Sequence, residues 1–179
     1  MDDQLQRLRA RVPAAAQSAG AGTEVPVEAG VQLAPRTTPA FHRMMTTVLG
    51  RMGAKYIIDE GEITGIWDNG LFEFFQLGED DQEMVVQIHG GWERILPEEN
   101  YSAAALFAND WNSQNAWPKA YAQIEEVERV VGIFGETTVN FGADLTLDQL
   151  ELMLNYGIGS ALGLFDAAEK AFPDAELIG

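Results

Sequence analysis

The segment from Thr146 to Pro173 constrains the fold most strongly, because it encodes one long amphipathic helix. Thr146 and Gln149 have the spacing of a capping box, in which each side chain bonds the backbone of the other residue. Apolar residues then recur at helical spacing, and Pro173 predicts the end of the helix. The stripe predicted to be buried consists of Leu150, Leu154, Ile158, Ala161, Phe165, Ala168 and Phe172.

The rest of residues 38–145 predicts a second and a third helix and several strands. Thr38-Pro39 is a favoured helix start, and apolar spacing continues to a stop at Gly53. Asp68-Asn69-Gly70 predicts a hairpin between two strand-like runs, and residues 83–89 form another such run. Residues 97–111 predict a helix, and residues 119–124 and 131–141 predict two strands. The order α-β-β-β-α-β-β-α indicates an α+β domain with an antiparallel sheet packed by helices.

The first 37 residues differ in composition from the rest. Residues 13–37 are rich in Ala, Gly and Pro and have few large apolar side chains, so they predict a flexible leader before a domain at residues 38–179. The N-terminus lacks the apolar region of a signal peptide, and no apolar run approaches the ~18 residues that span a bilayer. These features, with the absence of cysteine, predict a cytoplasmic protein that has no membrane partner.

Charge is distributed very unevenly. Residues 1–55 carry seven Lys/Arg and four Asp/Glu, whereas residues 56–179 carry four Lys/Arg and 24 Asp/Glu, for a net charge of −17 over the chain. Such an acidic body repels phosphate backbones, so nucleic acid is not expected as a partner. The charge suits a protein that handles basic or apolar segments of other proteins, although a need for solubility explains it equally well.

Candidate catalytic and metal-binding residues are few. The chain has two histidines, His42 and His89, and no Cys or His-carboxylate ligand spacing, so we predict no metal, no cofactor and no catalytic residue. Glu136 follows Phe134 in a predicted strand, and it is expected to pair with a cation such as Lys119 across the sheet. A catalytic carboxylate would usually need a second carboxylate or a histidine beside it.

Three glycines interrupt the last helix at positions 157, 159 and 163. Each costs about 1 kcal/mol of helix stability relative to Ala. A dinucleotide-binding fingerprint would need a preceding strand and a third glycine three residues after Gly159, where this chain has Leu162. Close approach of another backbone is the preferred explanation for all three.

The stretch NDWNSQNAWPKAY at residues 109–121 has a structural and a functional reading. In the structural one, Asn112 or Asn115 closes the helix in the left-handed conformation, Trp117 packs the chain onto the sheet, and Pro118 leads into a strand. In the functional one, Trp117, Lys119 and Tyr121 form a partner site, since exposed aromatic residues beside a cation make good binding anchors.

At these residues the chain resembles the YbjN-domain family of bacteria, particularly its actinobacterial members. The resemblance covers roughly residues 38–173 and rests on Asn109–Asn112, Trp117–Tyr121, Gly135-Glu136, Leu147-x-Gln149-Leu150 and Phe172-Pro173. It implies a fold like that of the type III secretion chaperones, a role in sensory transduction and no assigned catalytic residues. Because folds of that kind often work as dimers, it also implies self-association.

The function expected from these features is a non-enzymatic chaperone-like or regulatory module that binds a protein or peptide client. The alternative is an enzyme with an unrecognised acidic site. Strand parity places large apolar residues on both faces of the sheet, so the face away from the helices is the expected client or homodimer interface. The partner-binding residues of this hypothesis are Val85, Trp117, Lys119, Tyr121, Val130 and Phe134.

Overall fold

The computed structural model describes residues 38–77, 84–125 and 127–178. Its first half contains α2 (Pro39–Arg51), β1 (Lys55–Asp59), β2 (Glu62–Trp67), β3 (Gly70–Leu77), β4 (Val85–Trp92), β5 (Arg94–Pro97) and a short 3-10 turn, η1 (Glu98–Asn100). The second half contains α3 (Tyr101–Gln114), β6 (Lys119–Glu125), β7 (Val130–Asn140), α4 (Leu147–Ala171) and β8 (Glu176–Leu177). The predicted α+β class with an antiparallel sheet is confirmed.

The predicted element order missed three strands. The described residues include β1, β5 and β8 in addition to the five expected strands. All three are short, and β1 and β8 have largely exposed side chains without a buried alternating face. The predicted leader lies outside the described residues.

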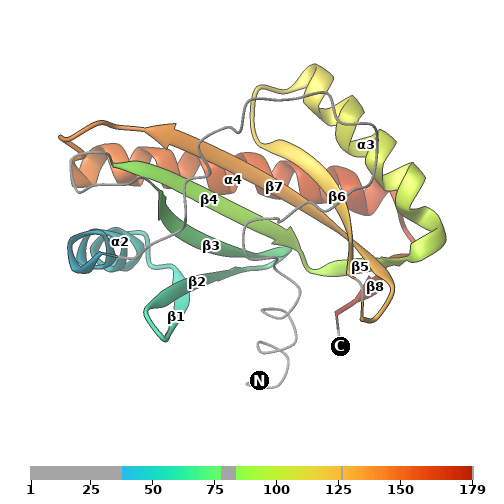
Figure 1. Cartoon of the computed structure of the whole chain (residues 1–179), viewed down its shortest axis with the longest axis horizontal. Coiled ribbons are helices and arrows are strands. Elements are labelled where there is room, and N and C mark those ends of the chain that lie inside the picture. The colour runs from blue at the N-terminus through green and yellow to red at the C-terminus, as the bar shows by residue number, and fades with distance from the viewer. Residues whose placement is uncertain (1–37, 78–83, 126, 179) are drawn as a thin grey trace, which may run out of the picture.

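The sheet is antiparallel throughout, with β1, β2, β3 and β4 side by side and β7 next to β4. β5 pairs with the start of β7, and β6 covers the opposite edge of β7 along its first half. In Figure 1, α4 runs behind the sheet along its length, α2 lies at the end that carries β1 to β3, and α3 lies beside β6. The helices therefore cover one face of the sheet.

The helix starts agree with the sequence signals. The Thr38 hydroxyl accepts a hydrogen bond from the Phe41 amide, and Thr146 and Gln149 form the predicted capping box. Gly53, with φ +65°, follows the end of α2. These local interactions satisfy amide groups that have no partner inside the helix.

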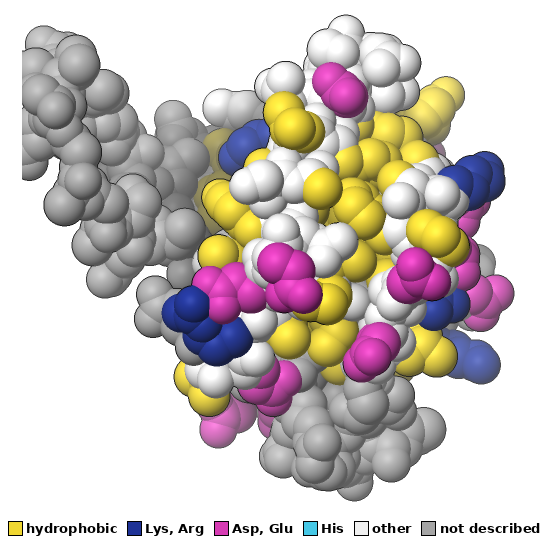
Figure 2. Space-filling model, turned by 90° about the vertical axis from the view of Figure 1, so that its right-hand side faces the viewer, with side chains coloured by type: hydrophobic (Ala, Val, Ile, Leu, Met, Phe, Trp, Pro, Cys, Tyr) yellow, Lys and Arg dark blue, Asp and Glu magenta, His cyan; other side chains and the backbone are white. Residues whose placement is uncertain are grey.

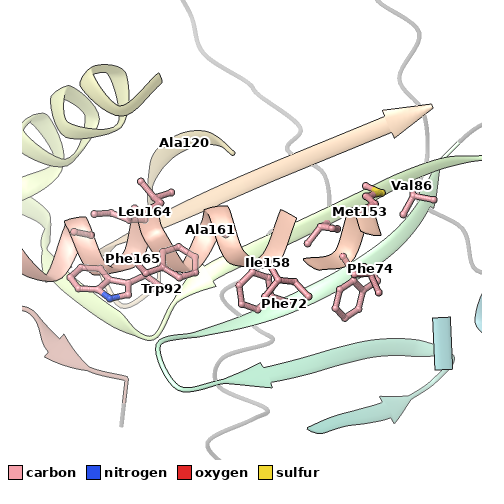
Figure 3. Close-up of a cluster of buried hydrophobic side chains, with 14 of the residues drawn as sticks. Phe72, Phe74, Val86, Trp92, Ala120, Met153, Ile158, Ala161, Leu164 and Phe165 are labelled. Carbon is pink, nitrogen blue, oxygen red and sulfur yellow. The ribbon is translucent and has the colours of Figure 1, made fainter. Parts of the chain in front are cut away.

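The core lies between α4 and the sheet. Phe72, Ile88 and Ile133 on the sheet are buried with Ile158 and Phe165 on α4. Figure 3 shows Phe72, Ile158 and Phe165 along the length of α4, with Leu164 and Ala120 at one end and Met153 and Val86 at the other. The opposite face of the sheet, which we call the outer face, has no helix of the described chain against it.

Candidate functional site

A row of four polar side chains crosses the outer face. Glu73 on β3 lies opposite His89 on β4, His89 lies opposite Glu136 on β7, and Glu136 lies opposite Lys119 on β6. Side chains in register on adjacent strands point to the same face and lie close enough to interact. Four separate strands thus bring two carboxylates, an imidazole and an ammonium group into one line.

The His89 ring of this row also belongs to a stack of three aromatic rings, together with those of Phe134 and Tyr121. The Phe134 ring lies 5.5 Å from the His89 ring and 5.4 Å from the Tyr121 ring, between centroids, with interplanar angles of 13° and 25°. Gly91 and Gly132 make room for it, because a Cβ on Gly132 would come within 2.7 Å of the Phe134 ring. The stack therefore depends on the two glycines as well as on the rings.

His89 is held by the residues on both sides of it. Its Nε2 shares a 2.8 Å hydrogen bond with Tyr121 Oη, and its Nδ1 lies 3.7 Å from Glu73 Oε2. The second distance is too long for a hydrogen bond, although it suits an ion pair when the imidazole is protonated. His89 is only 4% exposed, so its ring cannot be reached directly from solvent.

The Lys119–Glu136 pair predicted from the sequence is confirmed. Lys119 Nζ lies 2.9 Å from Glu136 Oε2 and 5.4 Å from the centroid of the Tyr121 ring. Gln87 Nε2 donates to the other carboxylate oxygen of Glu136 at 3.3 Å. The Lys119 side chain is 71% exposed, so this pair orients Glu136 but adds little to stability.

Tyr121 is the one residue of the site with a strongly shifted pKa. Burial, and then the nearby carboxylates of Glu136 and Glu73, raise the pKa of the Tyr121 hydroxyl far above its ordinary value. The hydroxyl is therefore neutral at physiological pH and acts as a hydrogen-bonding group. It is poorly suited to act as a nucleophile or base.

The 109–121 stretch positions β6 through a side-chain clamp. Asn112 Oδ1 accepts a hydrogen bond of 2.7 Å from the Ala120 amide, and Asn112 Nδ2 donates to the Ala120 carbonyl at 2.9 Å. Trp111 Nε1 donates to the Pro118 carbonyl at 3.3 Å. These bonds tie the end of α3 to the start of β6, and they place Lys119 and Tyr121 on the outer face.

Two details of the structural reading were wrong. Asn112 stays helical and Asn115 is extended (φ −127°), so neither closes α3 in the left-handed conformation. Their side chains bond to the backbone instead, Asn112 to Ala120 and Asn115 to the Trp111 carbonyl. Trp117 is 46% exposed, and it is Trp111 that packs against the core.

The structure brings together only some of the hypothesised partner-binding residues. Lys119, Tyr121 and Phe134 lie in contact, and Trp117 lies two residues before Lys119. Val85 lies opposite Asn140 at the far end of β4, and Val130 lies at the start of β7 opposite Glu125. Neither valine belongs to the aromatic stack.

Sequence reasoning did not connect Glu73 and His89 to this site. Both lie at outward positions of strands whose inward neighbours are buried, as Phe72 and Ile88 show. A polar residue between aromatic residues in β3 is the signal that could have marked Glu73. A hollow of about 620 Å³ adjoins Glu73 and extends to His42 and Arg43 on α2 and to Glu60 and Glu62.

The described residues contain neither a candidate metal site nor a candidate membrane-spanning helix. They contain no group of three His, Asp or Glu side chains that could hold a metal ion. No helix among them is long and apolar enough to cross a membrane.

Comparisons with known proteins agree with the resemblance in the sequence. The YbjN family model, described as "Putative bacterial sensory transduction regulator", matches residues 44–170. The crystal structure of YbjN from E. coli, described as "a putative transcription regulator", has a TM-score of 0.61 and 8% identity and covers 76% of this chain and 95% of its own. At that identity the likeness shows the fold alone. No curated protein matches the chain. Because the family model matches well over half of its residues, the chain belongs to the YbjN family, which is described as regulatory.

Proposed function

We propose that this protein is a non-enzymatic regulatory protein that holds a basic, extended segment of a partner protein on the outer face of its sheet. One observation carries the proposal: a stack of three rings, flanked by Glu73 and Glu136, lies on the face that none of the described helices covers. The His89 and Phe134 rings are buried and support the half-buried Tyr121 ring from behind. The Tyr121 face and the two carboxylates together suit Lys or Arg side chains, through cation–π contacts and ion pairs.

The charge of the domain supports a basic partner. Residues 56–179 carry 24 Asp/Glu against four Lys/Arg, which favours the approach of a cationic segment. The hollow beside Glu73 lies between α2 and strands β2 and β3, at the border of the outer face. It adds Glu60 and Glu62, and Arg43 on α2 also lines it. An extended peptide could therefore place successive basic side chains against several carboxylates.

The second candidate, an enzyme, has one observation in its favour. Glu73, His89 and Tyr121 form a line of carboxylate, imidazole and hydroxyl. However, the raised pKa of Tyr121 keeps its hydroxyl protonated, and His89 is 4% exposed and cannot contact a substrate without a rearrangement. These two facts favour the binding function.

The proposal can be tested by fluorescence anisotropy with the full chain and labelled extended peptides. We expect a peptide rich in Arg and apolar residues to bind, and the same peptide with Glu in place of Arg not to bind. Glu73→Gln combined with Glu136→Gln should weaken binding about tenfold, which corresponds to ~1.4 kcal/mol.

The matched control is Asp174→Asn combined with Glu176→Gln, at exposed positions near the C-terminus. It changes the net charge equally and should leave binding unchanged. Equal weakening by both pairs would mean that the peptide senses only the overall charge. Failure of the basic peptide to bind at micromolar concentrations would contradict the proposal.

A further inference from the structure

We infer that residues 1–12 of this chain form an amphipathic helix that packs on the outer face of the sheet, over β1, β2 and β3. The inference does not rest on the proposed function, because it concerns contact between two parts of one chain. If both hold, the segment competes with the partner peptide, since Glu73 belongs to both surfaces.

The outer face over β1, β2 and β3 carries apolar side chains that the core does not use. Ile66 on β2 lies opposite Leu71 on β3, and Phe75 lies two residues beyond Glu73 on the same face. Ile57 on β1 faces the same side. These four apolar residues are half-buried and lie outside the core cluster between α4 and the sheet. Such a surface gains stability when a second apolar surface covers it.

The first twelve residues, MDDQLQRLRARV, have the pattern of a short amphipathic helix. Their large apolar residues are spaced four, three and four positions apart, so a helix places them in one narrow stripe. They are Met1, Leu5, Leu8 and Val12. Arginines flank the stripe on both sides. A helix of this length is marginal in water, so it needs a surface on which to pack.

Charge is distributed unevenly over this part of the outer face. Lys55 lies at one end of it, opposite Ile66. The other end, next to the turn between β1 and β2, is rich in carboxylates. These belong to Asp59, Glu60, Glu62 and Glu73. His42 and Arg43 of α2 line the hollow at this end, where carboxylates outnumber the one arginine.

The segment has the complementary distribution of charge. Two aspartates lie at its start, and three arginines lie at alternate positions in its second half. Asp3 and Arg11 are eight residues apart, or about 12 Å along a helix. Lys55 and Asp59 are four residues apart, or about 13 Å along a strand. A helix that runs in the direction of β1 therefore places its aspartates near Lys55 and its arginines near the carboxylates. The reverse direction would place like charges together.

The connection to the domain permits this arrangement. In this direction the helix ends at the acidic end of the surface, where Thr38 lines the hollow together with Glu62. Residues 13–37 are rich in Ala, Gly and Pro, and a chain of 25 residues with such a composition has an end-to-end distance of about 25–30 Å. It keeps the segment at a local concentration on the order of 1 mM, so a weak contact suffices to hold it.

Two other uncovered apolar surfaces serve as controls. Figure 2 shows the end of the domain that lies on the right in Figure 1, where hydrophobic side chains gather among Asp and Glu side chains. Leu106 on α3 is 67% exposed, and Tyr156 on the exposed side of α4 is 62% exposed. That side of α4 also carries Gly159, where a Cβ would meet nothing within 4 Å, so the predicted close approach of another backbone there is wrong within the described residues. The hollow next to Thr38 borders the outer face, so we place the segment on that face.

Cysteine cross-linking in the full-length chain tests the position and direction of the segment, since the natural chain has no cysteine. Under mild oxidation, Arg11→Cys with Glu62→Cys should form a disulfide within one molecule. The matched pair Arg11→Cys with Lys55→Cys should form it at least about tenfold more slowly, because Lys55 lies about 13 Å from the acidic end. The two pairs enclose chains of similar length, so in urea they should close at similar rates. Mass spectrometry of proteolytic peptides would identify each disulfide.

Arg11→Cys paired with Leu106→Cys or with Tyr156→Cys tests the two other surfaces. If either of these pairs, or the Lys55 pair, closes as fast as the Glu62 pair in the folded chain, the inference is overturned. A Glu62 pair that links only two different molecules would overturn it as well, because the occupant would then belong to a second copy.

Amide hydrogen exchange measures the helix in the chain without cysteines. We expect the amides of residues 5–12 to exchange at least about tenfold more slowly in the natural chain than in a free peptide of the same sequence. Leu8→Gln should abolish this protection, because it places an amide group in the apolar stripe. The matched variant Ala10→Gln alters the opposite side of the helix and should keep it. No protection in the natural chain, or equal protection in both variants, would overturn the inference.

The same variants separate this inference from the proposed function. If the outer face also holds a partner, Leu8→Gln should bind the labelled basic peptide severalfold more tightly than the natural chain, and Ala10→Gln should not. A protected segment in a chain that binds no basic peptide would support the helix and contradict the proposed partner. Peptide binding by a chain whose segment is unprotected would support the partner and overturn the helix.

Discussion

Neighbouring residues of the same strands lie in two different environments. Phe72 and Ile88 face α4 in a dry apolar core, whereas Glu73 and His89 face the outer side. Both His89 and Phe134 are nevertheless buried, at 4% and 8% exposure. The helix-covered face gains stability from close apolar packing, which depends on volume. The outer face depends on hydrogen bonds, ring stacking and small glycines, which are directional.

The largest effect on stability is expected from a substitution on the helix-covered face. Phe165 is completely buried and its ring lies 6.0 Å from that of Phe72. Phe165→Ala should lower the free energy of unfolding by about 3–5 kcal/mol, because it removes buried surface and leaves a cavity. Urea unfolding would measure this loss. A loss below about 1 kcal/mol would show that the helix contributes much less to the core than its burial indicates.

A smaller effect is expected from a change that acts only on the outer stack. Gly132→Ala would push a methyl group into the Phe134 ring and should cost about 1–2 kcal/mol. The matched control is Gly50→Ala on α2, where a Cβ would meet nothing within 4 Å and Ala should stabilise the helix. Urea unfolding and near-UV circular dichroism would separate the two. Similar stability changes in both variants would show that the stack does not depend on Gly132.

The smallest effect concerns Tyr121 and depends on pH. Its hydroxyl has a raised pKa in the folded protein, so the folded state keeps a proton that the unfolded state loses above its ordinary pKa of 10.0. Its contribution to stability is complete below pH 10 and falls as the pH rises further. Tyr121→Phe should reduce the decrease in the free energy of unfolding above pH 10. At neutral pH the same change should lower the free energy of unfolding by about 0.5–1.5 kcal/mol, because the hydrogen bond to His89 is lost.

The control for that experiment is Tyr156→Phe, since Tyr156 is 62% exposed and lies outside the site. Its alkaline stability profile should match that of the natural chain. An alkaline profile that Tyr121→Phe leaves unchanged would place the origin of the pH dependence elsewhere.

Helices and the hairpin could be predicted because their signals are local. The capping box at Thr146, the Thr38-Pro39 start and the turn before Gly70 each depend on a few consecutive residues. β1 could not be predicted, because among the described strands it pairs with β2 alone and all its side chains are exposed or half-buried. Its place in the sheet depends on partners rather than on its own pattern.

The candidate site was predicted in part, for a related reason. Strand parity correctly placed Tyr121 and Phe134 on one face. It could not show that β4 lies next to β7, since α3 and β6 separate them in the chain. Only that pairing brings His89 opposite Glu136, and with them Glu73. The register between distant strands is set by tertiary packing, which no local pattern records.

The Asn112 clamp also affects how the sheet meets other chains. β6 borders the sheet, and an open border strand can pair with a strand of another molecule and start ordered aggregation. The Asn112 side-chain amide forms hydrogen bonds with both the backbone N–H and the backbone C=O of Ala120, as a neighbouring strand would. A strand that adds to β6 therefore cannot begin at Ala120 and has to start farther along, from Ala122 onward, where fewer residues remain before the strand ends at Glu125. A single side chain thus shortens the border that is open to polymerisation.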